Sequence, residues 1–353
     1  MKPDFAAAGK DTCALLSAID YDNLPISDYN KRYIDRLKPA LTYYLKIYSC
    51  CLAKGLQHSA QSLSGITMVD FGGGSGFLSI YAKKLGVGNV IYVDLNPLSV
   101  ETVTLLKKKT GVGADVILHG SSDTLAAWCT ENGVSPDLLV STDLIEHVYN
   151  LDTLFSELLG INNRMRMVFS TASNPYNPYI RRRLQRMMHE CEHGLLEVPN
   201  YYAKRKNYIR QRFASFSEQE VEELAMKTRG LIYADIDRVI KEQQSPVPMD
   251  SYNTCDPETG NWAERILPVR SYRSILLKYA CEVSVYKGFY NINRTRKWKS
   301  FVFGFLNLFI RMSGGIGFLL SPFIVLVCDR KENPHKIQNS FFYVVIQIFG
   351  VLF

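Results

Sequence analysis

The residues VDFGGGSGF (69–77) join two apolar segments of different character through a run of glycines. The segment before the glycines, ITMVDF (66–71), predicts a buried strand, and the segment after them, FLSIYAKKLG, predicts a helix. Glycines in such a turn let a ligand approach the backbone, and the N-terminus of the helix faces that ligand. The stretch therefore predicts a nucleotide-binding turn.

Four more runs of strand character follow, separated by helical spacers. They are NVIYVD (89–94), DVILH (115–119), DLLVST (137–142) and RMRMVFST (164–171). Continuous apolar strands that alternate with helices build a parallel sheet covered on both faces. The sequence thus predicts a doubly wound α/β fold.

Composition places the chain among ordinary globular proteins. It has 353 residues, 47% of them hydrophobic and 21% charged. This size and balance suit one large domain or two smaller ones. The eight cysteines form no C-x-x-C pair, so we expect reduced thiols rather than a disulfide framework. The start of the sequence lacks the apolar region of a signal peptide, and we expect a cytoplasmic protein with peripheral contact to the inner face of the membrane.

The glycine run has a spacing that separates two families of nucleotide-binding folds. A dinucleotide fingerprint needs a third glycine where Phe77 stands, and the chain has Asp70-x-Gly72-x-Gly74-x-Gly76 instead. This spacing, with an acid (Asp94) ending the second strand, resembles the class I S-adenosylmethionine-dependent methyltransferases. The segment STDLIEHV (141–148) is similar to the D-x-x-E-H-V segment of the subgroup that includes quinone and many natural-product O-methyltransferases.

The resemblance implies a Rossmann-like sheet of seven strands with an antiparallel last strand, a helical N-terminal cap and a helical insertion after the fifth strand. CEVSVYKGFYN and SPFIVLVCDRK fit its sixth and seventh strands. The domain boundaries that we expect are 1–64 for the cap, 65–171 for the cofactor-binding core, 172–267 for the insertion, 268–332 for the end of the sheet and 333–353 for an apolar tail.

The same resemblance implies a cofactor, S-adenosyl-L-methionine, and the residues that bind it. These are Asp70, Gly72, Gly74, Gly76, Asp94, Leu95, Ser121, Ser122, Asp123, Ser141 and Thr142. For Ser121 and Asp123 a plain helix N-cap is an alternative role. A hydroxyl acceptor must lose a proton as it attacks, which makes His147 the candidate general base and Asp143 its substitute. A histidine that only orients the loop beside Glu146 is the alternative for His147.

The stretch HECEH (189–193) spells the H-E-x-x-H motif of zinc peptidases. Two histidines four residues apart face the same side of a helix and can both reach a metal, with Glu190 beside it. No third ligand of suitable spacing accompanies them, so we predict no metal site. We interpret His189 and His193 as acceptor contacts instead, with the neighbouring Arg182 and Arg183 as phosphate binders.

The segment RKWKSFVFGFLNLFIRM ends in an amphipathic stretch, 298–312, whose polar residues form one narrow stripe: Ser300, Gly304, Asn307 and Arg311. Such a helix suits a membrane interface or an apolar acceptor channel, and it is too short to span a bilayer. A helix buried against the sheet is the alternative. The apolar tail at 340–353 is a second candidate for contact with a membrane surface.

Together these patterns predict a methyltransferase that O-methylates a membrane-associated or phosphate-bearing acceptor, such as a lipid-linked, glycan or quinone-like molecule. We expect a small-molecule or lipid-linked partner and no nucleic acid, and the sequence leaves a homo-oligomer open. The alternatives are a non-catalytic binding module with a cofactor fold and a zinc hydrolase acting through His189, Glu190 and His193.

Overall fold

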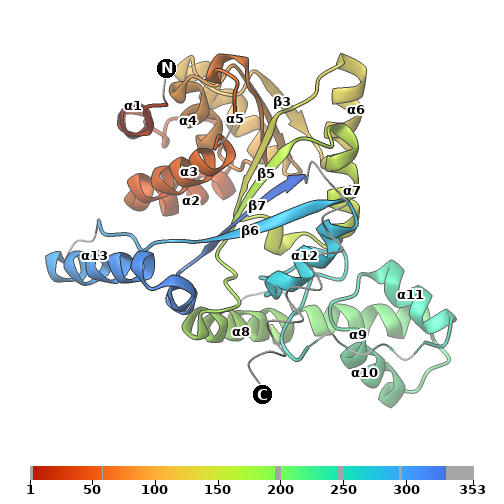
Figure 1. The fold of residues 1–353 in the computed structure, drawn as a ribbon. Helices are drawn as coiled ribbons and strands as arrows, with labels where there is room; N and C mark the ends of the chain where they lie inside the picture. Colours follow the sequence, from red (N-terminus) through yellow and green to blue (C-terminus); the bar gives the residue numbers. More distant parts are fainter. Residues whose placement is uncertain are drawn as a thin grey trace, which may run out of the picture.

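The computed structural model describes residues 3–57, 59–194, 200–244, 246, 248, 250–293 and 296–330. A seven-stranded sheet in the order β3-β2-β1-β4-β5-β7-β6 forms its centre (Figure 1). The strands are β1 (Thr67–Phe71), β2 (Asn89–Asp94), β3 (Val116–His119), β4 (Leu138–Thr142), β5 (Arg166–Thr171), β6 (Cys281–Lys287) and β7 (Ile324–Arg330). Strand β7 runs antiparallel to both β5 and β6, whereas β1 to β5 are mutually parallel. The predicted fold class is confirmed.

Each face of the sheet is covered by its own apolar layer, because successive side chains of a strand point to opposite faces. On one face, Met68 and Val140 pack with residues of the N-terminal helices. On the other face, Val69 and Leu139 pack with residues of α6, α7 and α12. The central strands are therefore buried on both sides, which explains their unbroken apolar sequence.

The helices of the core connect the strands and lie on the two faces. They are α4 (Phe77–Leu85), α5 (Pro97–Thr110), α6 (Ser122–Asn132) and α7 (Leu151–Ile161), with short 3-10 turns η2 (Leu63–Gly65) and η3 (Ile145–His147). Helices α4 and α5 contribute to the first apolar layer, and α6 and α7 contribute to the second.

The predicted N-terminal cap is helical and packs on the first face of the sheet. It contains α1 (Phe5–Ser17), α2 (Asp28–Leu37), the 3-10 turn η1 (Lys38–Ala40) and α3 (Leu41–Gly55). The helical pattern read from Asp28 onward is broken at η1, because Pro39 has no backbone N–H to continue the α-helical ladder. The break turns one long helix into two.

The insertion between β5 and β6 consists of helices, as predicted. They are α8 (Pro178–His193), α9 (Tyr201–Arg212), α10 (Glu218–Lys227), α11 (Tyr233–Lys241) and α12 (Val269–Leu277). Helices α9, α10 and α11 gather at one end of the molecule (Figure 1) around a small apolar core of their own. Helix α10 begins with the predicted capping box of Ser217 and Glu220.

Helix α13 (Lys297–Met312), followed by the 3-10 turn η4 (Gly314–Leu319), extends away from the sheet (Figure 1). One residue of its polar stripe, Asn307, faces inward: it accepts a hydrogen bond from the backbone of Tyr290 and donates one back to its carbonyl, whereas Gly304 and Arg311 are exposed. Only Ile310 of the helix is buried, so the alternative of a helix buried against the sheet is wrong. No helix in the described residues is both long and apolar enough to cross a membrane. The predicted membrane contact at 340–353 lies outside the described residues.

Candidate functional site

A cleft of about 830 Å³ opens at the carboxyl ends of the parallel strands. Sheet order reverses between β1 and β4, and a crevice at such a reversal is the usual ligand site of an open α/β sheet. Its wall contains residues from the turns after β1, β2, β3 and β4 and from the N-terminal cap. The ones used below are Tyr29, Tyr33, Gly72, Gly74, Asp94, Leu95, Ser121, Ser122, Asp123, Asp143 and His147.

The glycine loop gives this cleft its floor. Gly74 has φ +53°, and a Cβ added to it would lie 3.3 Å from the Tyr33 hydroxyl, so the loop passes closely beneath that ring. Two backbone N–H groups of the loop are used within the protein: Gly72 donates to the Val93 carbonyl (2.8 Å) and Gly76 to the Gly73 carbonyl (2.9 Å). The glycines let a ligand in the cleft approach the backbone closely.

Asp94 ends β2 and connects the loop to the next turn. Its carboxylate accepts the N–H of Gly74 (2.9 Å) and that of Asn96 (2.8 Å), one on each oxygen. Each carboxylate oxygen can accept another bond, so Asp94 retains the capacity to hold two ribose hydroxyls. Leu95 beside it is 70% exposed within the cleft wall. Its side chain provides an apolar surface suited to an adenine ring.

Four predicted cofactor residues lie behind the cleft wall. Asp70 is only 1% exposed, lies beneath the glycine loop and accepts a hydrogen bond from Ser79 Oγ at 2.6 Å. Burial raises the pKa of the Asp70 carboxyl to about 7. Gly76 begins α4 in the left-handed region at φ +71°, against Val103. Ser141 and Thr142 end β4 outside the cleft wall, and the hydroxyl of Ser141 is buried without a hydrogen-bond partner. None of these four residues belongs to the wall of the cleft.

Ser121, Ser122 and Asp123 line the cleft at the start of α6. Ser121 stands at the N-cap position, but its side chain makes no capping bond and donates to Asp123 Oδ1 at 2.5 Å. That bond lowers the pKa of Asp123. Ser122 donates to Glu157 on α7 at 2.5 Å. Ser121 therefore does not serve as a plain helix N-cap.

His147 and Asp143 both face the cleft from the loop after β4. The Nδ1 atom of His147 lies 2.7 Å from the carbonyl oxygen of Trp262, which can only accept. This contact requires the proton on Nδ1 in the neutral ring and leaves Nε2 with a free lone pair. Asp143 has φ +59°, a left-handed conformation, and its N–H donates to the Ser170 carbonyl at 2.9 Å.

Two acids that the sequence did not single out lie behind this loop. Glu146 is fully buried and accepts hydrogen bonds from Thr171 Oγ1 (2.6 Å) and the Ala172 N–H (3.2 Å). Burial, reinforced by the charges of Asp143 and Glu264, raises its pKa well above the usual range. Burial also raises the pKa of Glu264, which accepts a bond from Ser173 Oγ at 2.8 Å. The two hydrogen bonds of Glu146 anchor the loop to the end of β5.

Tyrosines of the N-terminal cap form a part of the site that sequence reasoning missed. Tyr29 and Tyr33, one helical turn apart on α2, line the cleft. Burial raises the pKa of Tyr33 and of Tyr44, with the nearby Asp143 charge adding to both effects. The only local sequence signal for this part of the site was the four-residue spacing, which places Tyr29 and Tyr33 on one face of a helix. That spacing does not indicate that this face meets the glycine loop.

The HECEH residues lie elsewhere. His189 and His193 share a face of α8, with ring centroids 4.4 Å apart, and line a separate cleft of about 280 Å³. They do not line the cofactor cleft, because that face of α8 turns toward Arg229 and residues 251–252. The described residues contain no group of three or more His, Cys, Asp or Glu side chains arranged to hold a metal.

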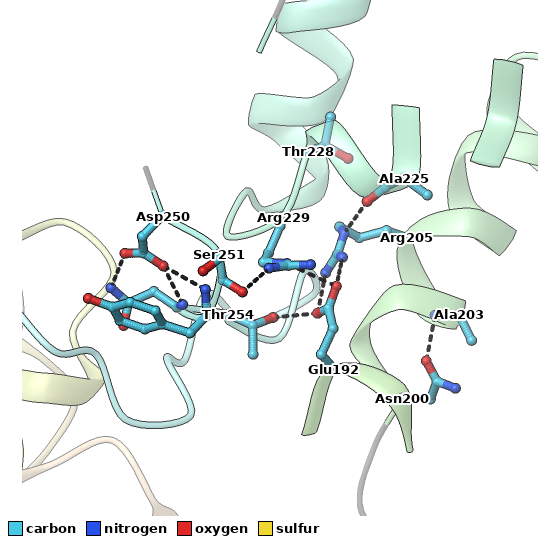
Figure 2. Close-up of polar contacts among 12 residues, drawn as sticks. Glu192, Asn200, Ala203, Arg205, Ala225, Thr228, Arg229, Asp250, Ser251 and Thr254 are labelled. Atoms are coloured by element: carbon cyan, nitrogen blue, oxygen red, sulfur yellow. Dashed lines mark hydrogen bonds and ion pairs between the residues drawn. The ribbon is translucent and has the colours of Figure 1, made fainter. Parts of the chain in front are cut away.

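The buried acid of HECEH is Glu192. It pairs with Arg205 (2.5 Å) and Arg229 (3.3 Å) and accepts a bond from Thr254 Oγ1, as Figure 2 shows. The predicted phosphate binders Arg182 and Arg183 are both exposed on α8. Arg183 lies close enough to Glu264 for its charge to oppose the rise in that pKa.

Comparison with known proteins gives the cofactor core a family. Residues 49–160 match the family model of ribosomal protein L11 methyltransferase (PrmA). The L11 methyltransferase of Vibrio parahaemolyticus is 31% identical over 127 residues, 35% of this chain and 40% of that protein. The Cupriavidus pinatubonensis enzyme is 42% identical over 58 residues, 16% of this chain and 20% of that protein. The chain thus spans less than half the length of these relatives.

Among solved structures, an S-adenosylmethionine-dependent methyltransferase from Listeria monocytogenes covers 80% of this chain and 100% of its own, at 13% identity and a TM-score of 0.37. The family match contains the glycine loop, Asp94 and the loop after β4, and it ends before α8. The sheet order and the family match over residues 49–160 support the class I S-adenosylmethionine-dependent methyltransferase superfamily for the cofactor core.

Proposed function

We propose that the chain transfers the methyl group of S-adenosylmethionine to a hydroxyl of its acceptor, with His147 as the general base. The observation that carries the proposal is the 2.7 Å contact between His147 Nδ1 and the Trp262 carbonyl, on a residue that lines the cofactor cleft. That contact orients the ring and keeps Nε2 basic. A positioned base of this kind typically contributes about 10²- to 10⁴-fold to a rate.

The residues have separate tasks in this proposal. The bound cofactor supplies an electrophilic methyl group, and the glycine loop with Asp94 and Leu95 holds it. Tyr29 and Tyr33 close the cleft from the cap side and exclude water. Nε2 of His147 takes the proton that the acceptor hydroxyl loses, and Asp143, on the same loop, stabilises the imidazolium that results.

The acceptor class has two candidates. A quinone-like, glycan or lipid-linked hydroxyl is favoured by the D-x-x-E-H-V segment and by the basic surface of α8, which carries Arg182 and Arg183. A protein side chain is favoured by the relatives, whose name refers to ribosomal protein L11. The family match ends at residue 160, so α8, which carries the proposed acceptor contacts His189 and His193, lies outside it.

Contact with a lipid surface is a further part of the proposal, and α13 supports it. The helix exposes Phe301 (79%), Phe305 (66%) and Met312 (75%). Its cations Lys297, Lys299 and Arg311 bring positive charge, and the helix contains no acid. Exposed apolar side chains flanked by cations are typical of helices that lie in a membrane interface.

Cofactor binding is tested by calorimetry with S-adenosylhomocysteine on wild type, Asp94→Asn and Glu101→Gln. We expect micromolar binding in wild type and in Glu101→Gln, because the carboxylate of Glu101 is exposed on α5. Asp94→Asn should weaken binding at least about tenfold, since one ribose hydroxyl loses its charged acceptor. Tight zinc binding with no nucleoside binding would overturn the proposal in favour of a hydrolase.

The acceptor is tested with cofactor that carries a labelled methyl group, added to cell extract with the purified chain. Label in the lipid or small-molecule fraction supports a hydroxyl acceptor of the proposed class, and label in precipitated protein supports the alternative. His147→Gln should bind S-adenosylhomocysteine as wild type does and transfer at least about 100-fold more slowly. Binding without any transfer, in wild type as in the variant, would indicate a non-catalytic module.

Lipid contact is tested by co-sedimentation with vesicles of phosphatidylcholine, with and without phosphatidylglycerol. The double variant Phe301→Ser, Phe305→Ser should bind more weakly than wild type. Tyr179→Ser removes an aromatic ring that is 73% exposed on α8 and should change nothing. Equal sedimentation of all three proteins would refute a role of α13 at the lipid surface.

A further inference from the structure

Arg265 is a largely buried cation that lacks a counter-charge. Its guanidinium lies over the ring of Trp262, with Cζ 4.3 Å from the ring centroid, and its Nη1 donates to the Tyr149 carbonyl at 3.3 Å. Its Nε is fully buried and has no hydrogen-bond partner. Among the described residues no carboxylate forms an ion pair with the side chain, since the ion pairs of this region join other groups.

An arrangement of this kind is costly unless something outside the chain completes it. A guanidinium stays protonated in proteins, and burial here lowers its pKa without neutralising it. Desolvating an ion is unfavourable unless a partner compensates. Burial closes Nε off from a ligand, and Nη2, the remaining donor group, makes no bond to another described residue. The N–H groups of a guanidinium donate strong hydrogen bonds to carboxylates and phosphates.

Arg265 lines a second cleft of about 530 Å³, next to the cofactor cleft. Tyr149 and Asn150 belong to the walls of both. Two more cations, Lys227 and Arg229, line this cleft and pair with Glu223 and Glu192, and its one acid, Asp152, is paired with Lys278 at 2.8 Å. The rest of the wall is mainly apolar, with side chains such as Trp262, Leu231, Val239, Leu267 and Ile275.

We propose that this second cleft is a binding site for an organic anion, a phosphate monoester or carboxylate carried on an apolar or aromatic body. Arg265 binds the anion through its Nη2 donors, the ion-paired Arg229 and Lys227 also line the cleft, and the apolar wall holds the body. The site is independent of the proposed methyl transfer, because none of these three cations lines the cofactor cleft.

The test is titration calorimetry of the full chain with phenyl phosphate, without any cofactor. We expect saturable binding to one site, weakened at least about tenfold in Arg265→Gln and about threefold in Arg265→Lys, which keeps the charge but loses the fork. Arg270→Gln removes an exposed arginine of the nearby helix α12 and should leave the affinity unchanged. Circular dichroism melting verifies that each variant is folded.

Two comparison ligands make the result decisive. Phenol should bind at least about tenfold more weakly than phenyl phosphate if the anion is recognised, and inorganic phosphate should also bind more weakly if the apolar wall contributes. Equal affinity of phenyl phosphate for wild type and Arg265→Gln, or no binding to wild type up to millimolar concentration, overturns the assignment. Cofactor binding can fail or succeed in the separate experiment without changing this outcome.

Discussion

Two arginines of the insertion are buried in opposite ways. Arg205 on α9 is completely buried, and its guanidinium donates to both oxygens of Glu192 and to the Ala225 carbonyl (Figure 2). Arg265 is largely buried, lies on a tryptophan ring and has one hydrogen bond to a carbonyl. The first arginine has its hydrogen bonds satisfied by the chain, and the second does not.

The difference shows how the same residue type serves structure in one place and recognition in another. Glu192 receives two arginines and Thr254, so this network has no free donor edge for a ligand and holds α8, α9 and residues 251–254 together. Arg265 lines a cleft, and its Nη2 makes no bond to another described residue. This contrast is tested by variants of Glu192 and Arg210, which form ion pairs, and of Asp70 and Arg265, which form none among the described residues.

Glu192→Gln should cause the greatest loss of stability. The substitution leaves Arg205 buried without its counter-charge, which should lower the free energy of unfolding by about 3 to 5 kcal/mol. Glu190→Gln, two residues away in the same helix and free of ion pairs among the described residues, should change it by less than about 0.5 kcal/mol. Urea denaturation measures both, and similar values for the two variants would refute the structural role of Glu192.

Asp70 extends the contrast to a buried acid with only a hydroxyl as side-chain partner. Its pKa of about 7 in the fold lies above the ordinary 3.8, so its contribution to stability is fully present below pH 3.8 and is lost as the pH rises to about 7. Asp70→Asn removes this dependence. The stability of the variant relative to wild type should therefore increase by roughly 2 to 3 kcal/mol from about pH 5 to about pH 7 in urea denaturation. A relative stability independent of pH would mean that Asp70 is ionised in the folded protein.

Arg265→Met should act in the direction opposite to Glu192→Gln. Replacing an uncompensated buried cation by an apolar chain of similar length should raise the free energy of unfolding by about 1 kcal/mol in the absence of anions. Saturating phenyl phosphate should stabilise wild type and leave the variant unchanged, because only wild type binds it. A loss of stability as large as that of Glu192→Gln would show that Arg265 is as structural as Arg205.

Arg210→Gln should have almost no effect. Arg210 lies on the same helix as Arg205, but it is 48% exposed and pairs with Glu218 at the surface. Exposed ion pairs contribute little to stability because water and salt screen them, so the urea midpoint of the variant should match that of wild type. A shift of the midpoint comparable to that of Glu192→Gln would remove burial as the explanation of the contrast.

The features that the sequence predicted well are those encoded locally. The five parallel strands and the glycine turn depend on apolar runs and on residues a few positions apart, so their order could be read directly. Asp70 was predicted as a cofactor contact because it begins the motif, but the glycine loop passes over it and covers it.

Features that depend on packing between distant segments were not predicted. The partner of Glu192 is 13 residues away along the chain, and nothing in HECEH indicates that its second acid, rather than its histidines, is the buried group. Trp262 fixes His147 from 115 positions away. The inward orientation of Asn307 on α13 follows from Tyr290, which presents its backbone to this side chain.

The position of β7 in the sheet determines when the sheet can close while the chain is being made on the ribosome. Ile324 of β7 pairs with Thr171 of β5. The ribosome makes β7 only after the whole insertion and β6. At about 5 to 20 residues per second, the edge of β5 stays unpaired for roughly 10 to 30 seconds after it emerges. During this interval an apolar strand edge is open to pairing with other nascent chains. The helical insertion, which contains its own apolar core, is complete before the sheet can close.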